Sequence, residues 1–451
     1  MCLTQHDRQE RALEQGTTLL LGLPGVAVSR VERRQDGTRV VHLVTAGEYA
    51  GVCPGCGVVS TSMKEAVTTR PRDIPYGTDG LELVWHKHRW RCRTADCPRQ
   101  TFTEAIPQVP PRRRTTARLR TAVAHAVACN RSVAEVAAAY GIGWTTAQAC
   151  VDEYTDLVLT EPEPTPVLGI DETRRGKPRW DFDPLSRQCV RTDRWDTGFV
   201  DLHGDQGLLG QAEGRTSATV TGWLLSRSKA FRDAVRYVVI DPAASYRAAI
   251  TAQLLPNAQV VVDHFHLVRL ANDTVTAVRR RITWELRNRR GRKADPEWAN
   301  RRRLLTARER LRPAALSKMW TQLLTHDPTG QILAAWIAKE ELRTLLASAR
   351  EHAAPHVIRA RLHDFYAWCA DTDIPEVHRL AATIEAWWPE TLLFLQTGLT
   401  NARTEGINRI VKDVGRRACG FRNPHNHRRR VRLICTRHRR ASAMTKQRVP
   451  G

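Results

Sequence analysis

The chain has 451 residues, and 70 Lys and Arg against 47 Asp and Glu give it a formal net charge of +23. That length exceeds one ordinary hydrophobic core and predicts roughly two to four domains. The charge predicts strong, salt-sensitive attraction to a polyanion such as nucleic acid. No apolar run reaches the length of a membrane-spanning helix and no signal-peptide pattern is found, so we expect a cytoplasmic protein with no membrane partner.

Four of the eleven cysteines form two close pairs, Cys53-Pro-Gly-Cys56 and Cys92-Arg-Thr-Ala-Asp-Cys97. A reducing compartment would leave these side chains as thiols. Two close pairs on turns between strand-like stretches are typical of a tetrahedral zinc knuckle, and buried free cysteines are the alternative. We therefore predict a zinc-binding domain at 51–108, after an N-terminal segment of 1–50. The predicted ligands of one structural Zn²⁺ are Cys53, Cys56, Cys92 and Cys97.

A basic, Pro-rich linker and an Ala-rich helical region follow at 109–160. Ser132 is placed to cap a helix, with Glu135 at the reciprocal position of a capping box. Gly141 supplies a turn, and a second helix begins at Trp144. This pattern is typical of a helix-turn-helix, although a plain helical hairpin is the alternative.

The predicted helix-turn-helix indicates which side chains would contact DNA. Residues at the start of its second helix would reach base edges in the major groove. These are Trp144, Thr145, Thr146 and Gln148. Linker arginines would contact the phosphate backbone, and these are Arg112, Arg113 and Arg114.

A strand-rich region follows the Pro-rich segment at 161–166. Strands are expected at 167–171, 187–203 (one strand or two), 207–214, 236–241 and 259–263. Helices are expected at 217–227 and 245–254. Three strands followed by alternating helices and strands predict an α/β layer with a mixed sheet, which we assign to 161–263.

Two aspartates end β-branched apolar runs in this region, Asp171 in Val-Leu-Gly-Ile-Asp-Glu and Asp241 in Val-Val-Ile-Asp-Pro. Such runs predict buried strands, with the aspartate emerging at the strand end. Taken singly, an Asp there is more often a turn former or a helix cap. Carboxylates from neighbouring strand ends can also converge on a divalent cation.

A third carboxylate, Glu405, lies on an expected amphipathic helix. The predicted apolar face consists of Ile407, Ile410, Val411 and Val414. The opposite face carries Glu405, Asn408, Arg409, Lys412 and Arg416. A basic face beside a carboxylate suits a phosphodiester substrate, whereas a Glu on a polar face is usually only solvated.

The segment between the strands and this helix, 264–398, is helical in pattern and rich in Arg and Leu. It predicts an all-α insertion. The last segment, 399–451, would contain the Glu405 helix and a basic tail that includes Arg437, Arg439 and Arg440.

In chain order these features resemble the bacterial insertion-sequence transposases of the ISL3 family. The most specific matches are Asp263-His-Phe-His-Leu-Val268 and Asn401-Ala-Arg-Thr-Glu-Gly-Ile-Asn408. The resemblance implies a multidomain protein, α/β plus all-α. Its RNase H-like mixed-sheet core would carry a DDE triad and be interrupted by the all-α insertion. Carried over by position, the triad is Asp171, Asp241 and Glu405.

Asp263 is the rival for the second place in the triad, because it also ends an apolar strand. The RNase H-like order favours Asp241, and Tyr246 matches an aromatic residue that the family often carries shortly after the second aspartate. In that interpretation Asp263, His264 and His266 support the site.

The resemblance also implies cofactors and partners. Two Mg²⁺ (or Mn²⁺) ions held by the triad would cut the 3′ ends of the element and join them to target DNA. The partners implied are double-stranded DNA, as terminal inverted repeats and as target, and further copies of the chain in a synaptic complex on the nucleoid. The alternatives are a non-catalytic DNA-binding regulator and a structure-specific nuclease.

Overall fold

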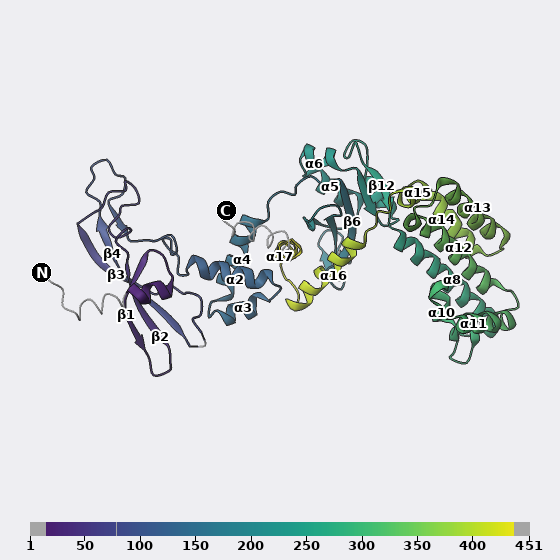
Figure 1. Cartoon of the computed structure of the whole chain (residues 1–451), viewed down its shortest axis with the longest axis horizontal. Helices are drawn as coiled ribbons and strands as arrows, with labels where there is room; N and C mark the ends of the chain where they lie inside the picture. Colours follow the sequence, from purple (N-terminus) through teal and green to yellow (C-terminus); the bar gives the residue numbers. More distant parts are fainter. Residues whose placement is uncertain (1–14, 78, 437–451) are drawn as a thin grey trace. The chain divides into compact units, whose positions relative to one another are not determined.

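The computed structural model describes residues 15–77 and 79–436 (Figure 1). It divides into two compact units, one of Met1–Thr160 with Val414–Ile434 and one of Glu161–Asp413 with Cys435–Gly451. The first boundary coincides with the start of the Pro-rich segment at 161–166. The predicted basic tail from Arg437 onwards lies outside the described residues.

The first unit begins with a five-stranded sheet. Its strands are β1 (Val26–Arg33), β2 (Arg39–Thr45), β3 (Met63–Thr69), β4 (Leu81–Arg91) and β5 (Thr101–Thr103). Their order is β1-β2-β4-β3, with β5 also paired to β4. Leu43, Leu83 and Trp85 are buried in the core of this sheet. Because β2 pairs in parallel with β4, residues expected as a separate segment at 1–50 belong to the same sheet as the predicted zinc domain.

Besides a helical segment at 15–21, the described helices of the first unit are α2 (Ala117–Ala128), α3 (Val133–Ala139), α4 (Trp144–Val158) and α17 (Pro424–Cys435). Ser132 caps α3 as predicted, its Oγ accepting from the backbone N of Glu135 at 3.1 Å. The turn between α3 and α4 contains Gly141, whose φ of 61° favours glycine. Leu433 of α17 packs into the core that α2, α3 and α4 share. This basic C-terminal helix therefore completes the helical core, which was not predicted.

The second unit contains a mixed sheet, as predicted. Its strands are β6 (Val167–Arg174), β9 (Trp195–Asp201), β10 (Leu208–Glu213), β11 (Tyr237–Ile240) and β12 (Gln259–Val262). The order is β10-β9-β6-β11-β12. β6, β11 and β12 run parallel, and β9 is antiparallel to β6 and β10. The residues at 238–240 are fully buried, as a central parallel strand requires.

The first strand of this sheet is longer than predicted. β6 continues to Arg174, because Arg174 is still paired with Trp195 of β9. Asp171 therefore lies inside the strand and not at its end. The expected strand at 187–203 is two strands, β8 (Gln188–Thr192) and β9. An unpredicted β7 (Arg179–Asp183) pairs with β8 in a separate hairpin.

Besides its two sheets the unit consists of helices, and most of those that follow β12 gather to one side of the mixed sheet (Figure 1). Those between strands are α5 (Ser217–Leu225), α6 (Lys229–Ala234), which was not predicted, and α7 (Ala244–Ala249). After β12 come α8 (His264–Arg287), α9 (Pro296–Ala299), α10 (Arg301–Leu305), the 3-10 turn η1 (Arg308–Arg310), α11 (Pro313–His326), α12 (Gln331–Glu351), α13 (Pro355–Asp371), α14 (Pro375–Ala386), α15 (Trp388–Thr397) and α16 (Ala402–Arg417). None of the helices in the described part of the chain is long and apolar enough to cross a bilayer.

One apolar core runs through the second unit. It contains Val239 and Val261 of the sheet, Val275 of α8, Leu342 of α12 and Phe394 of α15. The helices that follow β12 are therefore packed against the sheet through shared buried side chains.

Helix α16 lies against β6 at Gly169. A Cβ atom at Gly169 would be 2.5 Å from Thr404 Oγ1 and 2.8 Å from Asn401 Oδ1, far inside van der Waals contact. Asn401 and Thr404 are themselves buried. The absence of a side chain at Gly169 is what allows the helix to come this close to the strand.

Gly169→Ala should lower the free energy of unfolding by about 1–3 kcal/mol, as overpacking of a buried contact does. Gly222→Ala is the matched control. Gly222 lies in α5, and a methyl group added there would have no atom within 4 Å, so alanine should raise stability by about 0.5–1 kcal/mol. Denaturant unfolding of both variants checks this, and equal stability of the two would contradict the packing.

Candidate functional site

Acidic side chains converge where β6, β11 and β12 lie side by side. Asp171 and Glu172 come from β6, and Asp241 follows β11 directly. One carboxylate oxygen from each of these three lies within 4.8 Å of the others. A second group with the same spacing consists of Asp241, Asp263 and His266.

Hydrogen bonds fix the carboxylate of Asp171. Its Oδ1 accepts from the backbone N of Glu172 at 2.7 Å, and its Oδ2 accepts from Asn408 Nδ2 at 2.7 Å. Asn408 is held in turn by Thr173, whose hydroxyl donates to Asn408 Oδ1 at 2.7 Å. The side-chain amide of Asn408 thus links α16 to the carboxylate of the central strand.

Glu172 and Tyr246 form a second, partly buried contact beside Asp171. The Tyr246 hydroxyl donates to Glu172 Oε2 at 2.7 Å. Tyr246 lies on α7 and is 1% exposed. The role of Glu172 was not predicted, because the one signal for it in the sequence is its place next to Asp171.

Helix α16 differs in part from its predicted faces. Ile407, Val411 and Val414 are buried as predicted, but Ile410 is 38% exposed. Asn408, expected on the polar face, is 9% exposed and belongs to the site. The reason is that the helix packs on β6 through polar residues, so its buried face does not follow hydrophobicity alone.

The third predicted acid, Glu405, is half-buried in the first turn of α16. It lies close enough to act electrostatically on Asp171 and Asp241. Its carboxylate belongs to neither of the two compact groups of potential ligand atoms. The exposed side of the same helix carries Arg409, Lys412 and Arg416, as predicted.

The cluster is electrostatically costly without a counter-ion. Burial, and then the charge of Glu172, raises the pKa of Asp171 to about 7, although the backbone hydrogen bond from Glu172 opposes the rise. Burial and the charge of Asp171 raise the pKa of Asp241 to about 8. A divalent cation would relieve this repulsion and keep both carboxylates ionised.

Unpartnered buried atoms point to the same conclusion. Asp263 is fully buried, and no described group donates a hydrogen bond to either of its carboxylate oxygens. Asp241 Oδ1 also lacks a hydrogen bond, although it lies 3.1 Å from His266 Nε2 at ion-pair distance. Leaving such oxygens unpaired costs free energy. Oxygen-rich groups of this kind fit Mg²⁺ or Mn²⁺.

The structure brings both candidates for the second acid to this place. Asp241 and Asp263 follow adjacent parallel strands, and the backbone N of Asp263 donates to Ile240 O at 2.9 Å. Only Asp241 belongs to both groups of potential ligands. His264 points elsewhere, since its ring stacks on Phe394 at 4.7 Å between centroids.

The four predicted zinc ligands lie together in the first unit. Their Sγ atoms are all within 4.8 Å of one another. Cys53 Sγ is 3.8 Å from Cys97 Sγ, and Cys56 Sγ is 3.7 Å from Cys92 Sγ. Four sulfurs around a zinc ion at about 2.3 Å are about 3.8 Å apart at tetrahedral angles, so the quartet fits the ion.

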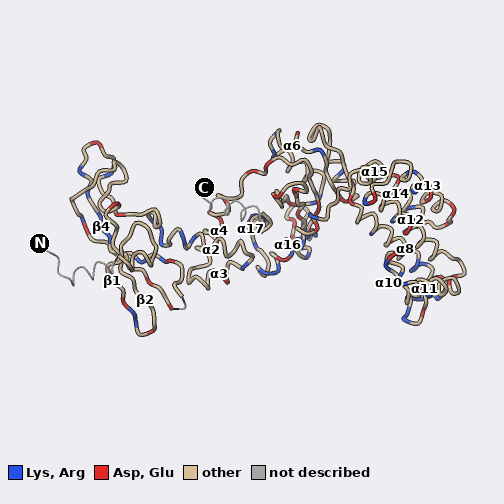
Figure 2. The backbone as a smooth tube through the Cα atoms, in the orientation of Figure 1, with Lys and Arg blue, Asp and Glu red and all other residues tan. Residues whose placement is uncertain are grey.

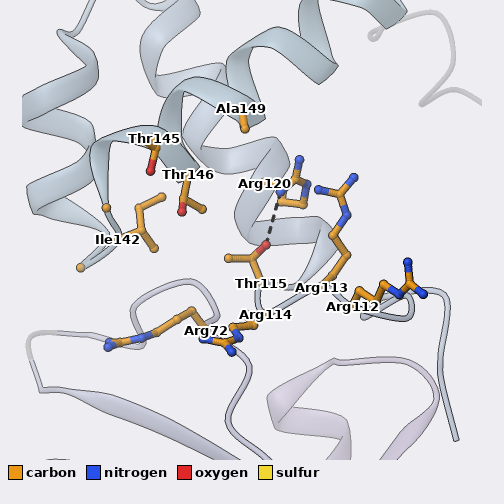
Figure 3. A pocket seen from close by; sticks show the side chains of 12 residues that line it. Arg72, Arg112, Arg113, Arg114, Thr115, Arg120, Ile142, Thr145, Thr146 and Ala149 are labelled. Carbon is orange, nitrogen blue, oxygen red and sulfur yellow. Dashed lines mark hydrogen bonds between the residues drawn. The ribbon is translucent and has the colours of Figure 1, made fainter. Parts of the chain in front are cut away.

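The first unit also has a basic pocket beside the start of α4 (Figure 3). Its basic lining residues are Arg72, Arg112, Arg113, Arg114 and Arg120. Thr145 and Thr146 of α4 face it, and Gly143 caps α4 without a side-chain hydrogen bond.

Not all of these arginines have the same surroundings. Arg113 and Arg120 form ion pairs with Glu153. Arg112 and Arg114 are exposed, and their side chains form no ion pair among the described residues. Two guanidinium groups and the free backbone N–H groups of a helix start suit a phosphate group.

Comparison with known families matches the same regions. A family model described as "Transposase", for the DDE part of ISL3 elements, matches residues 168–431, which is more than half of the chain. The chain belongs to the ISL3 family of transposases. A helix-turn-helix domain of transposase family ISL3 matches 104–155. A zinc-finger of transposase IS204/IS1001/IS1096/IS1165 matches 50–97.

Curated relatives of this ISL3 transposase are transposases too. The chain is 24% identical over 406 residues to the transposase for insertion sequence element IS1001 of Bordetella parapertussis, covering 89% of this chain and 93% of that protein. It is 28% identical over 250 residues to the transposase for IS1557 of Mycobacterium tuberculosis, covering 52% of this chain and 55% of that protein. The predicted family, helix-turn-helix and zinc finger are thus confirmed.

Removal of two ligands should empty the zinc site. Purified wild-type protein should contain about one equivalent of zinc, and the double variant Cys56→Ser, Cys97→Ser well under half of one, with a lower Tm. Cys189→Ser is the control, because Cys189 is exposed on β8. Elemental analysis with thermal unfolding checks this. Full zinc retention in the double variant would contradict the assignment.

Proposed function

We propose that this ISL3 transposase cuts the 3′ ends of its insertion sequence and joins them to target DNA, using Asp171, Asp241 and Glu405 as its triad. The observation that carries the proposal is the convergence of the acids of β6 and β11, with Glu405 of α16 near enough to act on them electrostatically. The raised pKa values of Asp171 and Asp241 are typical of a site built for cations.

The sheet supports an RNase H-like core for the proposal. Its order, β10-β9-β6-β11-β12, has the three antiparallel strands first in sequence and the two parallel strands after them. Asp171 lies on the central strand and Asp241 follows its parallel neighbour. The helices at 264–398 separate β12 from α16, so they would form the all-α insertion before Glu405.

The proposed chemistry divides between bound ions and protein groups. When bound, two Mg²⁺ or Mn²⁺ ions would supply an activated water or 3′-hydroxyl and stabilise the leaving oxygen. Asp171, Asp241 and Glu405 would hold the ions. Asn408 holds the carboxylate of Asp171 in one orientation.

Helix α16 also supplies groups for the substrate. Arg409, Lys412 and Arg416 follow Glu405 at intervals of about one helical turn and are exposed. They would hold the phosphates of the strand whose scissile bond lies at Glu405. Cleavage of that strand and attack by its 3′-hydroxyl then require no covalent intermediate with the protein.

Recognition of the terminal inverted repeats is assigned to the first unit. Trp144 and Thr145 are exposed at the start of α4, where side chains reach the major groove. Thr146 faces the basic pocket beside them (Figure 3). Gln148 donates to Asp152 Oδ1 at 3.0 Å and would exchange this bond for an adenine edge.

Basic residues occur in every described part of the chain (Figure 2), in agreement with a DNA substrate throughout the reaction. Two ends must be held together before joining, so the active complex would contain at least two copies. It would work in the cytoplasm, on the nucleoid. The rival functions, a regulator and a structure-specific nuclease, differ in measurable products: the regulator cuts nothing, and the nuclease cuts without joining.

Asp171→Asn, Asp241→Asn and Glu405→Gln should each lower cleavage and joining by about 10³-fold or more, because metal-ion catalysis contributes several kcal/mol. Binding to the element's ends should stay within experimental error of wild type. Mg²⁺-dependent cleavage of labelled end DNA and a mobility shift on the same DNA measure the two properties.

Asp364→Asn is the control for these variants, because Asp364 is an exposed carboxylate of α13. Normal cutting by Asp241→Asn together with an inactive Asp263→Asn would transfer the second place to Asp263. Normal cutting by all three triad variants would refute the triad.

Replacing Arg112 and Arg114 by Ala should reduce the salt dependence of end binding. The slope of log K against log salt should become less steep by about 1.8, or 0.9 for each lost phosphate contact. Arg308 and Arg310, exposed on η1, give a control double variant with the same change in net charge. An equal change of slope in both double variants would show that the pocket has no special role.

A further inference from the structure

We infer that Asp241, Asp263 and His266 form a cation site in which an imidazole nitrogen binds the metal, so that this part of the centre prefers Mn²⁺ to Mg²⁺. The inference deepens the proposed function, because Asp241 is shared with the triad. It adds a nitrogen ligand to a triad whose three ligands are all carboxylates.

Backbone structure holds the three side chains in place. β11 and β12 are parallel neighbours paired at Ile240 and Val262, so Asp241 and Asp263 leave the sheet side by side. Asp263 is the N-cap of α8 and His266 lies in its first turn, where His266 N donates to Asp263 O at 3.1 Å. Residues three apart at a helix start lie on one side of the helix.

The second observation is the state of the Asp263 carboxylate. An N-cap Asp normally accepts from a backbone N–H of the first turn. Asp263 makes no such bond, is fully buried, and has two oxygens without any hydrogen-bond partner among the described residues. His264 Nδ1, at 3.6 Å from Asp263 Oδ1, is too distant to donate. A bound cation would be the missing partner of this buried carboxylate.

An ion pair alone does not account for the arrangement. A protonated His266 at 3.1 Å would neutralise Asp241 but would leave Asp263 unpaired. Asp171 and Glu172 also add negative charge around Asp241. One divalent cation bound by all three side chains satisfies both carboxylates and the imidazole together.

The ligand set favours Mn²⁺ over Mg²⁺. Mg²⁺ prefers oxygen ligands in octahedral geometry, whereas imidazole nitrogen suits heavier divalent ions. Two carboxylates and one imidazole form a mixed set in which Mn²⁺ accepts all three donors. The remaining positions would be open to water or to a phosphate oxygen of DNA.

Pulsed electron paramagnetic resonance of the full-length, zinc-loaded protein with Mn²⁺ alone tests the inference. Electron spin-echo envelope modulation detects the ¹⁴N nucleus of an imidazole bound directly to Mn²⁺. The wild type should show this modulation. His266→Gln should lose it and bind Mn²⁺ about 10-fold or more weakly, with a smaller loss for Mg²⁺.

His264→Gln is the matched control, because His264 is the neighbouring imidazole and stacks on Phe394. It should keep the modulation. Labelling the wild type with ¹⁵N-histidine should change the modulation pattern without any mutation, so a misfolded variant does not decide the result. Absence of ¹⁴N modulation in the wild type, or its persistence in His266→Gln, would overturn the inference.

The readout is separate from strand transfer. If the triad variants remain active, the proposed function fails, but a nitrogen signal from His266 still establishes the cation site. If the triad variants are inactive and no nitrogen signal is found, the proposed function stands and Mn²⁺ binds through oxygen alone, without His266.

Discussion

The approach of α16 to β6 at Gly169 determines the geometry of the acidic centre. With no Cβ in the way, Asn401 and Thr404 pack directly on the strand, and the helix comes close enough for Asn408 to bond Asp171. Residues from chain positions more than 230 apart thereby share one hydrogen-bond network. Moving the helix outward by the radius of one methyl group would break that network and carry Glu405 away with it.

The same packing concentrates negative charge where water is scarce. Burial, and then the charge of the neighbouring acids, raises the pKa of Asp171 and of Asp241. Hydrogen bonds from Asn408 and Tyr246 orient the carboxylates but carry no positive charge. The fold therefore accepts a local electrostatic cost that bound cations would remove, which is common where function and stability compete.

The sequence predicted the elements whose patterns are local. Ser132 and Gly141 mark the helix-turn-helix, the cysteine pairs mark the zinc finger, and the β-branched runs mark the central strands. It did not predict the burial of Asn408 or the packing of Leu433 into the helix-turn-helix core. Both depend on contacts between residues distant in sequence, and a polar residue on a buried face violates the periodicity that identifies a helix.

Helix α8 runs without interruption from the acidic centre into the helices after β12. It begins directly after Asp263 and spans 24 residues, or about 36 Å at 1.5 Å per residue. Its Val275, Val278 and Ile282 are buried in the same core as the sheet. The helices after β12 therefore support the acidic centre and are not a detachable module. A short linker in place of everything after the first turn of α8 would remove the support that fixes the direction of that turn, and with it the position of His266.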